Sequence, residues 1–356
     1  MSRDLTRALL LDGDGTLRVA ELELADAGAD DVRVEVEAAA WSGRDREALS
    51  TGVRPLVLGA EAVGTVTAVG QGVEQAGQIE VGDRVVVTAV APCRTCATCT
   101  SGEPALCRTA AKRRGAPVGR VDGVPVRAAQ GVGALAGACV VPAAAVQRLP
   151  DGVPAGHAVL FSGALPTGVG AVRNVARAWP GERVVVLGGG AVGNAAVQGT
   201  VLAAAEPVLL VDPHALRRDL ALLAGAAEVC DPDDDVPGRV AGATAGVGAD
   251  HVVVAAPGDA ALAMALEVAR PGGTVTVLAG SGALRVGAAA LVDRGLRLLG
   301  ARWGGGDPAV EVPRLLELAM DGKLLLDELL GDELSLDDAV EALPAGGDAP
   351  RRLVRP

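Results

Sequence analysis

Four cysteines follow one another at a spacing that suits a tetrahedral metal ion. They form the pattern C-x2-C-x2-C-x7-C and are Cys93, Cys96, Cys99 and Cys107. Four thiolates on so short a segment can surround one Zn²⁺. No histidine lies in the segment, so thiolates would fill every ligand position, which is typical of a structural zinc and not of a catalytic one. The alternative, four incidental cysteines, leaves the spacing unexplained in a chain with six cysteines in all.

A glycine-rich turn follows the apolar residues 183–187 and opens an expected helix. It has the pattern G-x-G-x-x-G, in which Gly188 makes the tight turn and Gly190 lets the backbone approach a pyrophosphate. Gly193 allows close packing of the helix on the strand, and Val192 lies within the same turn. The N-terminus of such a helix offers N–H groups to phosphates. The pattern therefore predicts a dinucleotide-binding site.

An acidic residue ends the next expected strand. Asp212 lies 19 residues after Gly193, where an acidic side chain binds the adenosine ribose and repels a 2′-phosphate. NAD(H) is therefore favoured over NADP(H). Arg217 and Arg218 follow within a turn and weaken this preference, and Arg217 is placed with the cofactor site. The alternative is that Asp212 only caps a helix in a domain that binds nothing.

Two differently patterned parts of the chain must position these motifs. Before residue 155, short alternating segments broken by glycines predict a β-barrel-like domain, with strands at 7–11, 17–20, 32–36, 64–70 and 82–87. After it, apolar strands alternate with helices, which predicts an α/β domain with a parallel sheet. Its expected strands are 183–187, 207–211, 249–254 and 273–278. Its expected helices are 164–178, 191–205, 215–224 and 260–269, and two more follow at 312–320 and 336–343.

Composition and charge limit the partners that the chain can have. Half of its residues are apolar, which suits a large core, and the net charge of −12 argues against nucleic acid or an anionic membrane as partner. No apolar run has the length needed to span a bilayer, and residues 1–7 carry charges without an apolar signal region. We expect a cytoplasmic protein that acts on a small molecule.

Taken together, the motifs resemble those of the zinc-containing alcohol dehydrogenases of the medium-chain dehydrogenase/reductase family. Further matches are Gly59-Ala60-Glu61-Ala62-Val63-Gly64, Gly82-Asp83-Arg84-Val85, Leu165-Pro166-Thr167-Gly168 and Arg270-Pro271-Gly272-Gly273. The resemblance covers nearly the whole chain. It implies a GroES-like β-barrel catalytic domain over 1–155 with a structural zinc lobe at 93–107, a Rossmann doubly wound sheet over 156–300, and a return to the catalytic domain over 301–356. It also implies a homodimer or homotetramer.

The resemblance implies three ligands for a catalytic zinc, and this sequence has other residues at all three positions. Ser42 stands in place of one cysteine, Ala60 in place of the histidine, and Gly163 in place of the second cysteine. Alanine and glycine cannot ligate a metal, and a neutral serine hydroxyl is a poor Zn²⁺ ligand. We therefore expect one structural Zn²⁺ per chain and no catalytic Zn²⁺.

Other residues implied by the resemblance concern the proton and the cofactor. Arg44 replaces the serine or threonine of the proton relay. Thr167 matches a position near the nicotinamide, and Arg351 matches a C-terminal arginine that contacts the pyrophosphate.

Four polar side chains remain as candidates for catalysis at the former metal site. Arg44 can neutralise a substrate carboxylate, a phosphate or a developing enolate, and Ser42 can donate a hydrogen bond to a carbonyl. Glu61 or Asp45 can donate a proton if burial raises its pKa. The alternative is that Arg44 pairs with Glu61 or Asp45 to fill the space left by the metal, and that the Ser42 hydroxyl only fills space.

A site with a nicotinamide cofactor and no metal suits substrates that are already polarised. We expect a zinc-independent, NAD(P)H-dependent reductase of a C=N, conjugated C=C or C=O bond in bacterial specialised metabolism. Three alternatives stay open: a redox-neutral epimerase or lyase with tightly bound NAD, a non-catalytic nucleotide-binding protein, and an ordinary alcohol dehydrogenase. Cofactor turnover distinguishes the reductase, the redox-neutral enzyme and the non-catalytic protein from one another. An ordinary alcohol dehydrogenase would require substitute metal ligands.

Overall fold

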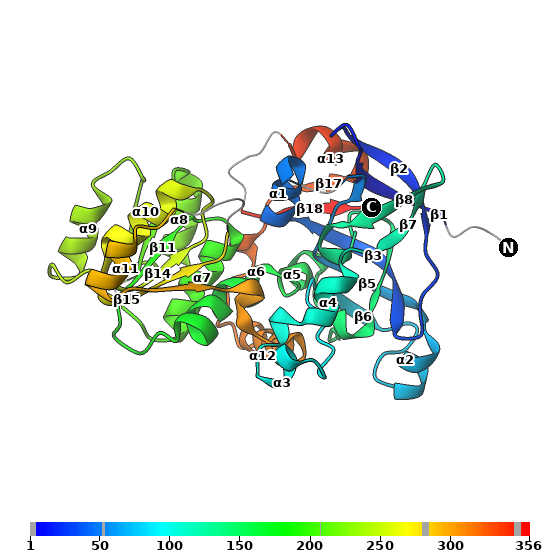
Figure 1. The fold of residues 1–356 in the computed structure, drawn as a ribbon, viewed down its shortest axis with the longest axis horizontal. Helices are drawn as coiled ribbons and strands as arrows, with labels where there is room; N and C mark the ends of the chain where they lie inside the picture. The colour runs from blue at the N-terminus through cyan, green and yellow to red at the C-terminus, as the bar shows by residue number, and fades with distance from the viewer. Residues whose placement is uncertain (1–4, 52–53, 207, 280–284, 345–349) are drawn as a thin grey trace.

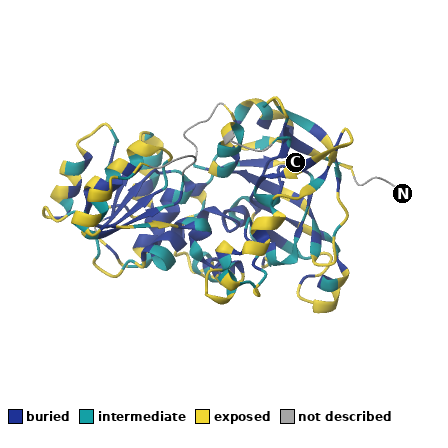
Figure 2. Ribbon diagram, in the orientation of Figure 1, coloured by how far each residue is buried: buried dark blue, intermediate teal, exposed yellow. Residues whose placement is uncertain are grey.

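The computed structural model describes residues 5–51, 54–206, 208–279, 285–344 and 350–356. Two halves lie side by side along the long axis (Figure 1). One half is built mostly from antiparallel β-structure, and the other is a parallel sheet flanked by helices. The dark strands of Figure 2 show that the buried residues concentrate on the sheets of both halves. The predicted architecture, a β-barrel domain joined to a parallel sheet with helices on both faces, is confirmed.

The first half contains a closed five-stranded barrel. Its strands follow the order β1 (Leu5–Leu11), β2 (Leu17–Leu24), β7 (Pro117–Val121), β8 (Val124–Ala128) and β4 (Leu56–Val57). Alternate side chains of β1 and β2 point into a small core that includes Leu10 and Leu22. Gly15, at the turn between these strands, has a φ of +93°, which explains the glycine there.

A second sheet shares this half and receives the end of the chain. Its strands run in the order β10 (Val146–Arg148), β6 (Arg84–Val87), β5 (Ala62–Val69), β3 (Asp31–Trp41), β18 (Arg352–Arg355) and β17 (Glu333–Ser335), and β9 (Ala138–Pro142) also pairs with β3. Strand β18 is antiparallel to β3, with Arg352 opposite Trp41. Because of this pairing, Arg351 lies close to the segment that follows β3.

Short helices connect the strands of the first half. They are α1 (Gly43–Thr51), α2 (Gln71–Ala76), α3 (Ala97–Thr100), η1 (Pro104–Leu106), α4 (Arg108–Arg113), η2 (Ala129–Gly131) and η3 (Ala143–Ala145). The chain then passes to the second half through α5 (Ala155–Leu160), α6 (Ala164–Gly170) and a π-helical turn, η4 (Ala171–Ala176).

The second half is a six-stranded parallel sheet with helices on both faces. Its order is β13 (Glu228–Cys230), β12 (Val208–Val211), β11 (Val184–Leu187), β14 (Ala249–Val254), β15 (Ala269–Val277) and β16 (Arg297–Gly300). One face packs on α7 (Ala191–Leu202), α8 (Ala215–Leu223) and η4. The other packs on α9 (Val236–Ala243) and α10 (Asp259–Val268), and α11 (Ala288–Arg294) lies near β15.

The C-terminal part leads back to the first half. It contains η5 (Arg302–Gly305), α12 (Pro308–Met320) and η6 (Asp327–Leu329), which are followed by β17, α13 (Leu336–Ala342) and β18. The two helices expected after residue 300 are confirmed as α12 and α13. None of the described helices is long and apolar enough to cross a membrane.

The structure corrects some expected boundaries. The helix expected over 164–178 consists of α6 and the π-helical turn, which ends at Arg177 with a φ of +56°. The strand expected from residue 207 begins at Val208, and residue 207 lies outside the described residues. Strands β13 and β16 and helices α9 and α11 were not expected from the sequence.

Candidate functional site

The four sulfur atoms of the cysteine loop are arranged as a zinc site requires. All four Sγ atoms lie within 4.8 Å of one another. The Sγ of Cys96 is 3.6 Å from that of Cys99 and 3.9 Å from that of Cys107. Zn–S bonds of about 2.3 Å in a tetrahedron give S–S distances of about 3.8 Å, so these side chains fit a structural Zn²⁺. Among the described residues, no other group of three or more His, Cys, Asp or Glu side chains is close enough to hold a metal.

Hydrogen bonds prepare this loop, the zinc lobe (residues 93–107), for a metal. The backbone N–H groups of Cys96 and Cys93 donate to the Sγ atoms of Cys93 and Cys107, each at 3.3 Å. Hydrogen bonding, chiefly from the Thr109 side chain, lowers the pKa of Cys93 to about 6. Such contacts favour the thiolate, which is the form that binds Zn²⁺.

The zinc lobe is tied to the C-terminal helix α12. Arg94 makes a two-pronged contact with Asp307, at 2.7 and 3.1 Å. The same carboxylate accepts a hydrogen bond from the Ala309 N–H at 3.0 Å and so caps the helix. These contacts anchor the zinc lobe to the start of α12.

The glycine turn has the geometry that a bound pyrophosphate needs. It joins β11 to α7, and Gly188 has a φ of +100°. A Cβ on Gly193 would lie 1.7 Å from the Gly188 carbonyl oxygen, whereas a Cβ on Gly190 would meet no atom within 4 Å. Gly193 is thus required by packing, and Gly190 faces the open space where a phosphate would lie. The turn fits a dinucleotide.

Asp212 holds the turn from the next strand. Its carboxylate accepts hydrogen bonds from the Gly189 N–H at 2.6 Å and the His214 N–H at 2.8 Å. Arg217 lies beside it, with 3.7 Å between Nη1 and Oδ2. Arg218 instead binds Asp231 and the Asp212 carbonyl, at 2.8 and 2.7 Å. The structure therefore brings Arg217 to the predicted ribose position and takes Arg218 away from it.

Thr167 lies on α6 beside the turn. It is half-buried on a helix whose other residues are buried. A Cβ on its neighbour Gly168 would lie 2.3 Å from the carbonyl oxygen of Val192, so α6 packs closely on α7. This packing places Thr167 next to the cofactor turn, and its contact with the nicotinamide stays a prediction.

Ser42 and Asp45 form a closed hydrogen-bonded unit at the start of α1. Asp45 Oδ2 accepts from the Ser42 hydroxyl at 2.6 Å and from the Ser42 N–H at 3.0 Å. Its Oδ1 accepts from the Gly59 N–H at 2.8 Å. Burial raises the pKa of Asp45, although these hydrogen bonds oppose the shift. Both carboxylate oxygens are occupied, so Asp45 is placed to fix the loop, and the Ser42 proton is already engaged.

Glu61 fills the space next to Gly163 and pairs with Arg351. A Cβ on Gly163 would lie 2.2 Å from both Cδ and Oε1 of Glu61. Oε2 of Glu61 is 2.9 Å from Nη1 of Arg351, and both groups are buried. Neither of these two atoms has a hydrogen-bond partner with good angles among the described residues, so the contact is mainly electrostatic. Burial raises the pKa of Glu61, and the Arg351 charge opposes the rise.

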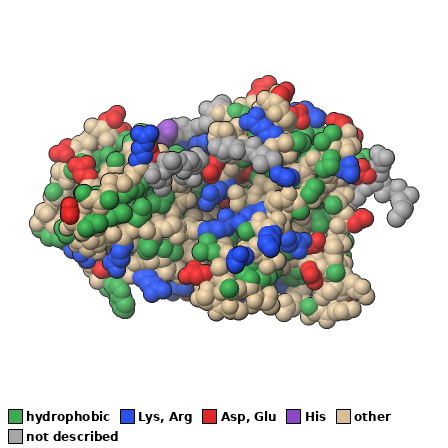
Figure 3. Space-filling model, viewed as in Figure 1, with side chains coloured by type: hydrophobic (Ala, Val, Ile, Leu, Met, Phe, Trp, Pro, Cys, Tyr) green, Lys and Arg blue, Asp and Glu red, His purple; other side chains and the backbone are tan. Residues whose placement is uncertain are grey.

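The ion pair considered between Arg44 and Glu61 or Asp45 is not formed. Arg44 extends from α1, and its Nη1 lies 3.4 Å from Oε2 of Glu47. Glu61 takes Arg351 as its partner because β18 pairs with β3 and brings the end of the chain to the site. The contact of Arg351 with a pyrophosphate stays a prediction. Lys and Arg side chains gather between the two halves on the face seen in Figure 3.

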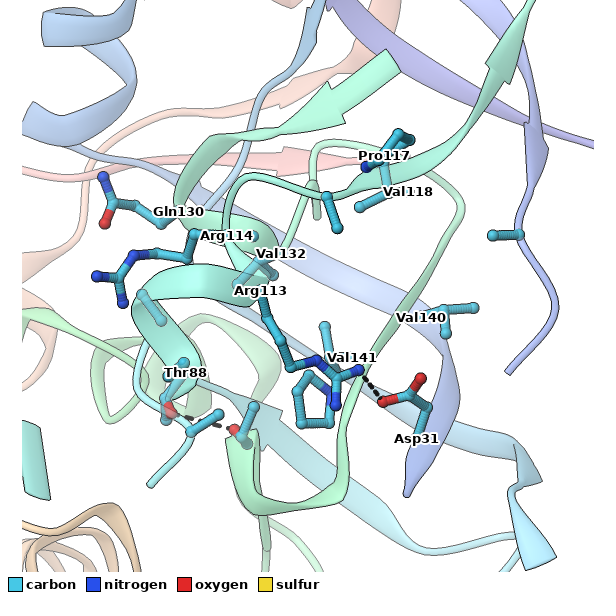
Figure 4. Close-up of a pocket in the computed structure, with 18 of the residues that line it drawn as sticks. Asp31, Thr88, Arg113, Arg114, Pro117, Val118, Gln130, Val132, Val140 and Val141 are labelled. Atoms are coloured by element: carbon cyan, nitrogen blue, oxygen red, sulfur yellow. Dashed lines mark hydrogen bonds and ion pairs between the residues drawn. The ribbon is translucent and has the colours of Figure 1, made fainter. Parts of the chain in front are cut away.

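A cavity of about 190 Å³ lies in the first half beside the zinc lobe, and Glu61 is not among the residues that line it. It lies among α4, η2 and β9, and Figure 4 shows Arg113 reaching across it to Asp31. Arg114 and Gln130 line its rim. The sequence motifs gave no indication of Arg114, Gln130 or Arg302, because no motif contains them.

Comparison with protein-family models identifies both halves. Residues 28–151 match the alcohol dehydrogenase GroES-like domain, and residues 191–321 match the zinc-binding dehydrogenase family. A protein of Mycobacterium tuberculosis, named as a probable zinc-binding alcohol dehydrogenase, is 32% identical over 360 aligned positions, which cover 98% of this chain and 88% of that protein.

Solved structures share the whole fold. The alcohol dehydrogenase zinc-binding domain protein from Burkholderia ambifaria has a TM-score of 0.88 at 24% identity, covering 99% of this chain and 98% of the other. A zinc-binding dehydrogenase from Sinorhizobium meliloti 1021, solved bound to NADP, has a TM-score of 0.80 at 26% identity and covers 99% and 100%.

Proposed function

The chain belongs to the zinc-type alcohol dehydrogenase family of medium-chain dehydrogenases/reductases, and from this premise we propose an oxidoreductase that acts without a catalytic zinc. Its substrate is a small molecule with a polarised C=N, conjugated C=C or C=O bond, which it reduces with NAD(P)H. The relatives in this family are oxidoreductases. The choice of bond and the absence of a catalytic metal are the proposal.

One observation carries the proposal. The carboxylate of Glu61 lies where a side chain at position 163 would begin, 2.2 Å from the Cβ position of Gly163. A buried ion pair of Glu61 with Arg351 therefore takes up space that a third metal ligand would need. The neighbouring positions offer the Ser42 hydroxyl, which is bound to Asp45, and the methyl group of Ala60. This set of donors does not suit Zn²⁺.

The remaining side chains can still handle a proton. Bound nicotinamide supplies the hydride. Glu61 holds a proton more tightly than an exposed glutamate because burial raises its pKa. When hydride adds to one atom of the double bond, the electron pair of the broken π bond moves to the other atom, and Glu61 is the candidate donor of a proton to that atom. Arg351 holds the Glu61 carboxylate in place. Asp45 and Ser42 hold the loop that carries Arg44.

We propose NAD(H) as the preferred cofactor. Asp212 is buried at the end of β12, beside the glycine turn, and its negative charge opposes a 2′-phosphate. Arg217 lies next to this carboxylate and partly offsets its charge. The relative from Sinorhizobium meliloti was solved with NADP, so NADPH is the comparison to make. Titration of the protein with NADH and NADPH tests the preference.

A paired substrate screen tests the reaction. Purified protein is given NADH with a cyclic imine, a conjugated enone or an aldehyde, and separately NAD⁺ with benzyl alcohol. We expect loss of NADH with the imine or enone, unaffected by a chelator that spares the zinc lobe, and at least tenfold slower turnover in Glu61→Gln. Glu74→Gln, at an exposed acid of α2, is the matched control. Product formed without net loss of NADH would point instead to a redox-neutral reaction.

The names of the relatives favour a second candidate, an ordinary alcohol dehydrogenase. It predicts NAD⁺-dependent oxidation of benzyl alcohol that disappears when a second zinc is removed. That result would contradict the proposal that no catalytic zinc binds beside Glu61 and Gly163.

A further inference from the structure

Three arginines from distant parts of the chain lie near one another around η2, and one of them binds Gln130. Arg302, in η5, places Nη1 and Nη2 each 3.3 Å from Oε1 of Gln130, and its Nη2 is also 3.3 Å from the Ala89 carbonyl. Arg114, at the end of α4, packs against Gly131, where a Cβ would lie 3.0 Å from Cγ of Arg114. Arg44 comes from α1, which packs on η2. We call these three side chains the arginine cluster.

Among the described residues, two of the three cations in the arginine cluster lack a carboxylate partner, whereas Arg44 lies 3.4 Å from Glu47. Within the described part of the chain, neither Arg114 nor Arg302 forms an ion pair with a carboxylate, and Nε of Arg302 is buried without a hydrogen-bond partner. Burial, and then repulsion by Arg114 and Arg44, lowers the pKa of Arg302 to about 10. Like charges gathered in a partly buried place are unfavourable unless an anion neutralises them.

The arginine cluster lies close to the candidate active site around Glu61 and Gly163. Trp303 follows Arg302 directly, and its indole N–H donates to the Ser162 carbonyl at 2.8 Å. Ser162 precedes Gly163, which lies against the Glu61 carboxylate. The same segment therefore positions a cation of the cluster and the wall of the candidate active site. In the face seen in Figure 3, basic side chains gather between the two halves.

The neighbouring arginine provides a contrast. Arg113 pairs with Asp31 across the cavity, whereas Arg114 lies beside Gln130 and points away from Arg113 (Figure 4). Two adjacent arginines thus have different roles: one is neutralised by an acid of β3, and the other remains available to a ligand.

We propose that the arginine cluster is the subsite for an anionic group of the substrate, either a carboxylate or a phosphate. Guanidinium groups bind both anions through paired, charge-assisted hydrogen bonds. The substrate class is then a small oxo, imino or unsaturated compound that carries such a group. The inference rests on the proposed function, because it assigns the cluster to the substrate of that reaction.

Binding of acetate and of inorganic phosphate tests the subsite. The zinc-containing protein is first saturated with NADH, so that the cofactor's own phosphate site is filled, and each anion is then titrated by calorimetry at an ionic strength held constant with sodium chloride. We expect saturable binding of at least one anion. Arg302→Gln and Arg114→Gln should each weaken it at least tenfold, and Arg113→Gln, the matched control, should leave it within twofold. The tighter of the two anions identifies the substrate group.

Other outcomes overturn the inference. If NADH binds but neither anion binds above chloride, or if Arg113→Gln weakens binding as much as Arg114→Gln, the subsite is wrong and the proposed function stands. If NADH itself does not bind, the proposed function fails instead. Should Arg302→Gln not fold, Arg44→Gln, which alters a side chain that is 40% exposed, provides the third variant, and unchanged binding in both remaining variants would contradict the subsite.

Discussion

Asp45 and Glu61 are two buried carboxylates whose partners give them different roles. Asp45 receives three hydrogen bonds, two from Ser42 and one from Gly59. Glu61 contacts the cation Arg351 and lies against the backbone of Gly163. A carboxylate with every oxygen occupied stabilises its surroundings, whereas one held mainly by charge can exchange a proton with a ligand.

Replacement of Asp45 should therefore destabilise the fold. Asp45→Ala leaves the N–H groups of Ser42 and Gly59 buried without an acceptor. Each such loss costs about 1–3 kcal/mol, so we expect the free energy of unfolding to fall by about 3 kcal/mol in urea melts. Asp26→Ala, at an exposed acid, should change it by less than about 0.5 kcal/mol. Equal effects of the two variants on the free energy of unfolding would show that the hydrogen bonds to Asp45 do not stabilise the fold.

The pH dependence of stability reports on Glu61. Its pKa in the folded protein is raised by burial, so the folded state binds this proton more tightly than the unfolded state. The contribution of Glu61 is then fully present below the unfolded pKa and is lost as pH rises through the folded pKa. The difference in unfolding free energy between wild type and Glu61→Gln should fall with a slope of up to about 1.4 kcal/mol per pH unit. A difference that grows with pH would mean that Arg351 lowers the pKa instead.

Single residues could be found from the sequence, but their pairing could not. Glu61, Arg44 and Arg351 all stand in recognisable motifs. Which of the two arginines meets Glu61 depends on the pairing of β18 with β3, and no local pattern encodes a contact between segments so far apart. Arg114, Gln130 and Arg302 gave no signal at all, because their proximity arises only from the packing of α4, η2 and η5.

At the scale of elements, the turn between β11 and α7 separates a packing glycine from a binding glycine. Gly193→Ala would place a methyl group 1.7 Å from the Gly188 oxygen, so we expect a fall in melting temperature and loss of NADH binding. Gly190→Ala meets no atom within 4 Å and should fold normally while binding NADH at least tenfold more weakly. Gly242→Ala, also in open space, should affect neither property. Fluorescence titration with NADH, alongside thermal melts, distinguishes these three results.

Elements with strong patterning were predicted well, and those without it were missed. The fully buried strands β11 and β12 stand out in the sequence as apolar runs, and β14 ends in three consecutive valines. Helix α11 has no buried residue and β16 is mostly exposed, so neither shows a periodic apolar pattern. The helix expected over 164–178 was too long because a π-helical turn has no signature in the spacing of apolar residues.

At the scale of the whole molecule, hydrogen bonds from α7 and from the segment after β16 join the two halves. Gln198 of α7 exchanges hydrogen bonds with Leu325, at 2.9 and 2.8 Å. Arg302 reaches from the segment after β16 to Ala89 in the first half. A ligand bound between β11, α7 and α6 is therefore expected to stabilise both halves together.

Cofactor binding should raise the stability of the whole chain. At an NADH concentration of about a hundredfold over Kd, the free energy of unfolding should increase by about 2.7 kcal/mol. NADPH at the same concentration should give a smaller increase because Asp212 opposes the 2′-phosphate. Urea melts with each cofactor measure both effects. An equal or larger increase with NADPH would show that Arg217 and not Asp212 decides the preference.

The zinc content of the purified protein tests the central claim, that the active site works without a metal. Elemental analysis of protein purified without added metal should give about one zinc per chain, because the four cysteines of the zinc lobe are the one suitable ligand set among the described residues. Cys96→Ser should lose that zinc, and Cys139→Ser, at a buried cysteine of β9, should keep it. About two zinc ions per chain, with one retained in Cys96→Ser, would contradict the account and make ordinary alcohol dehydrogenase chemistry the leading explanation.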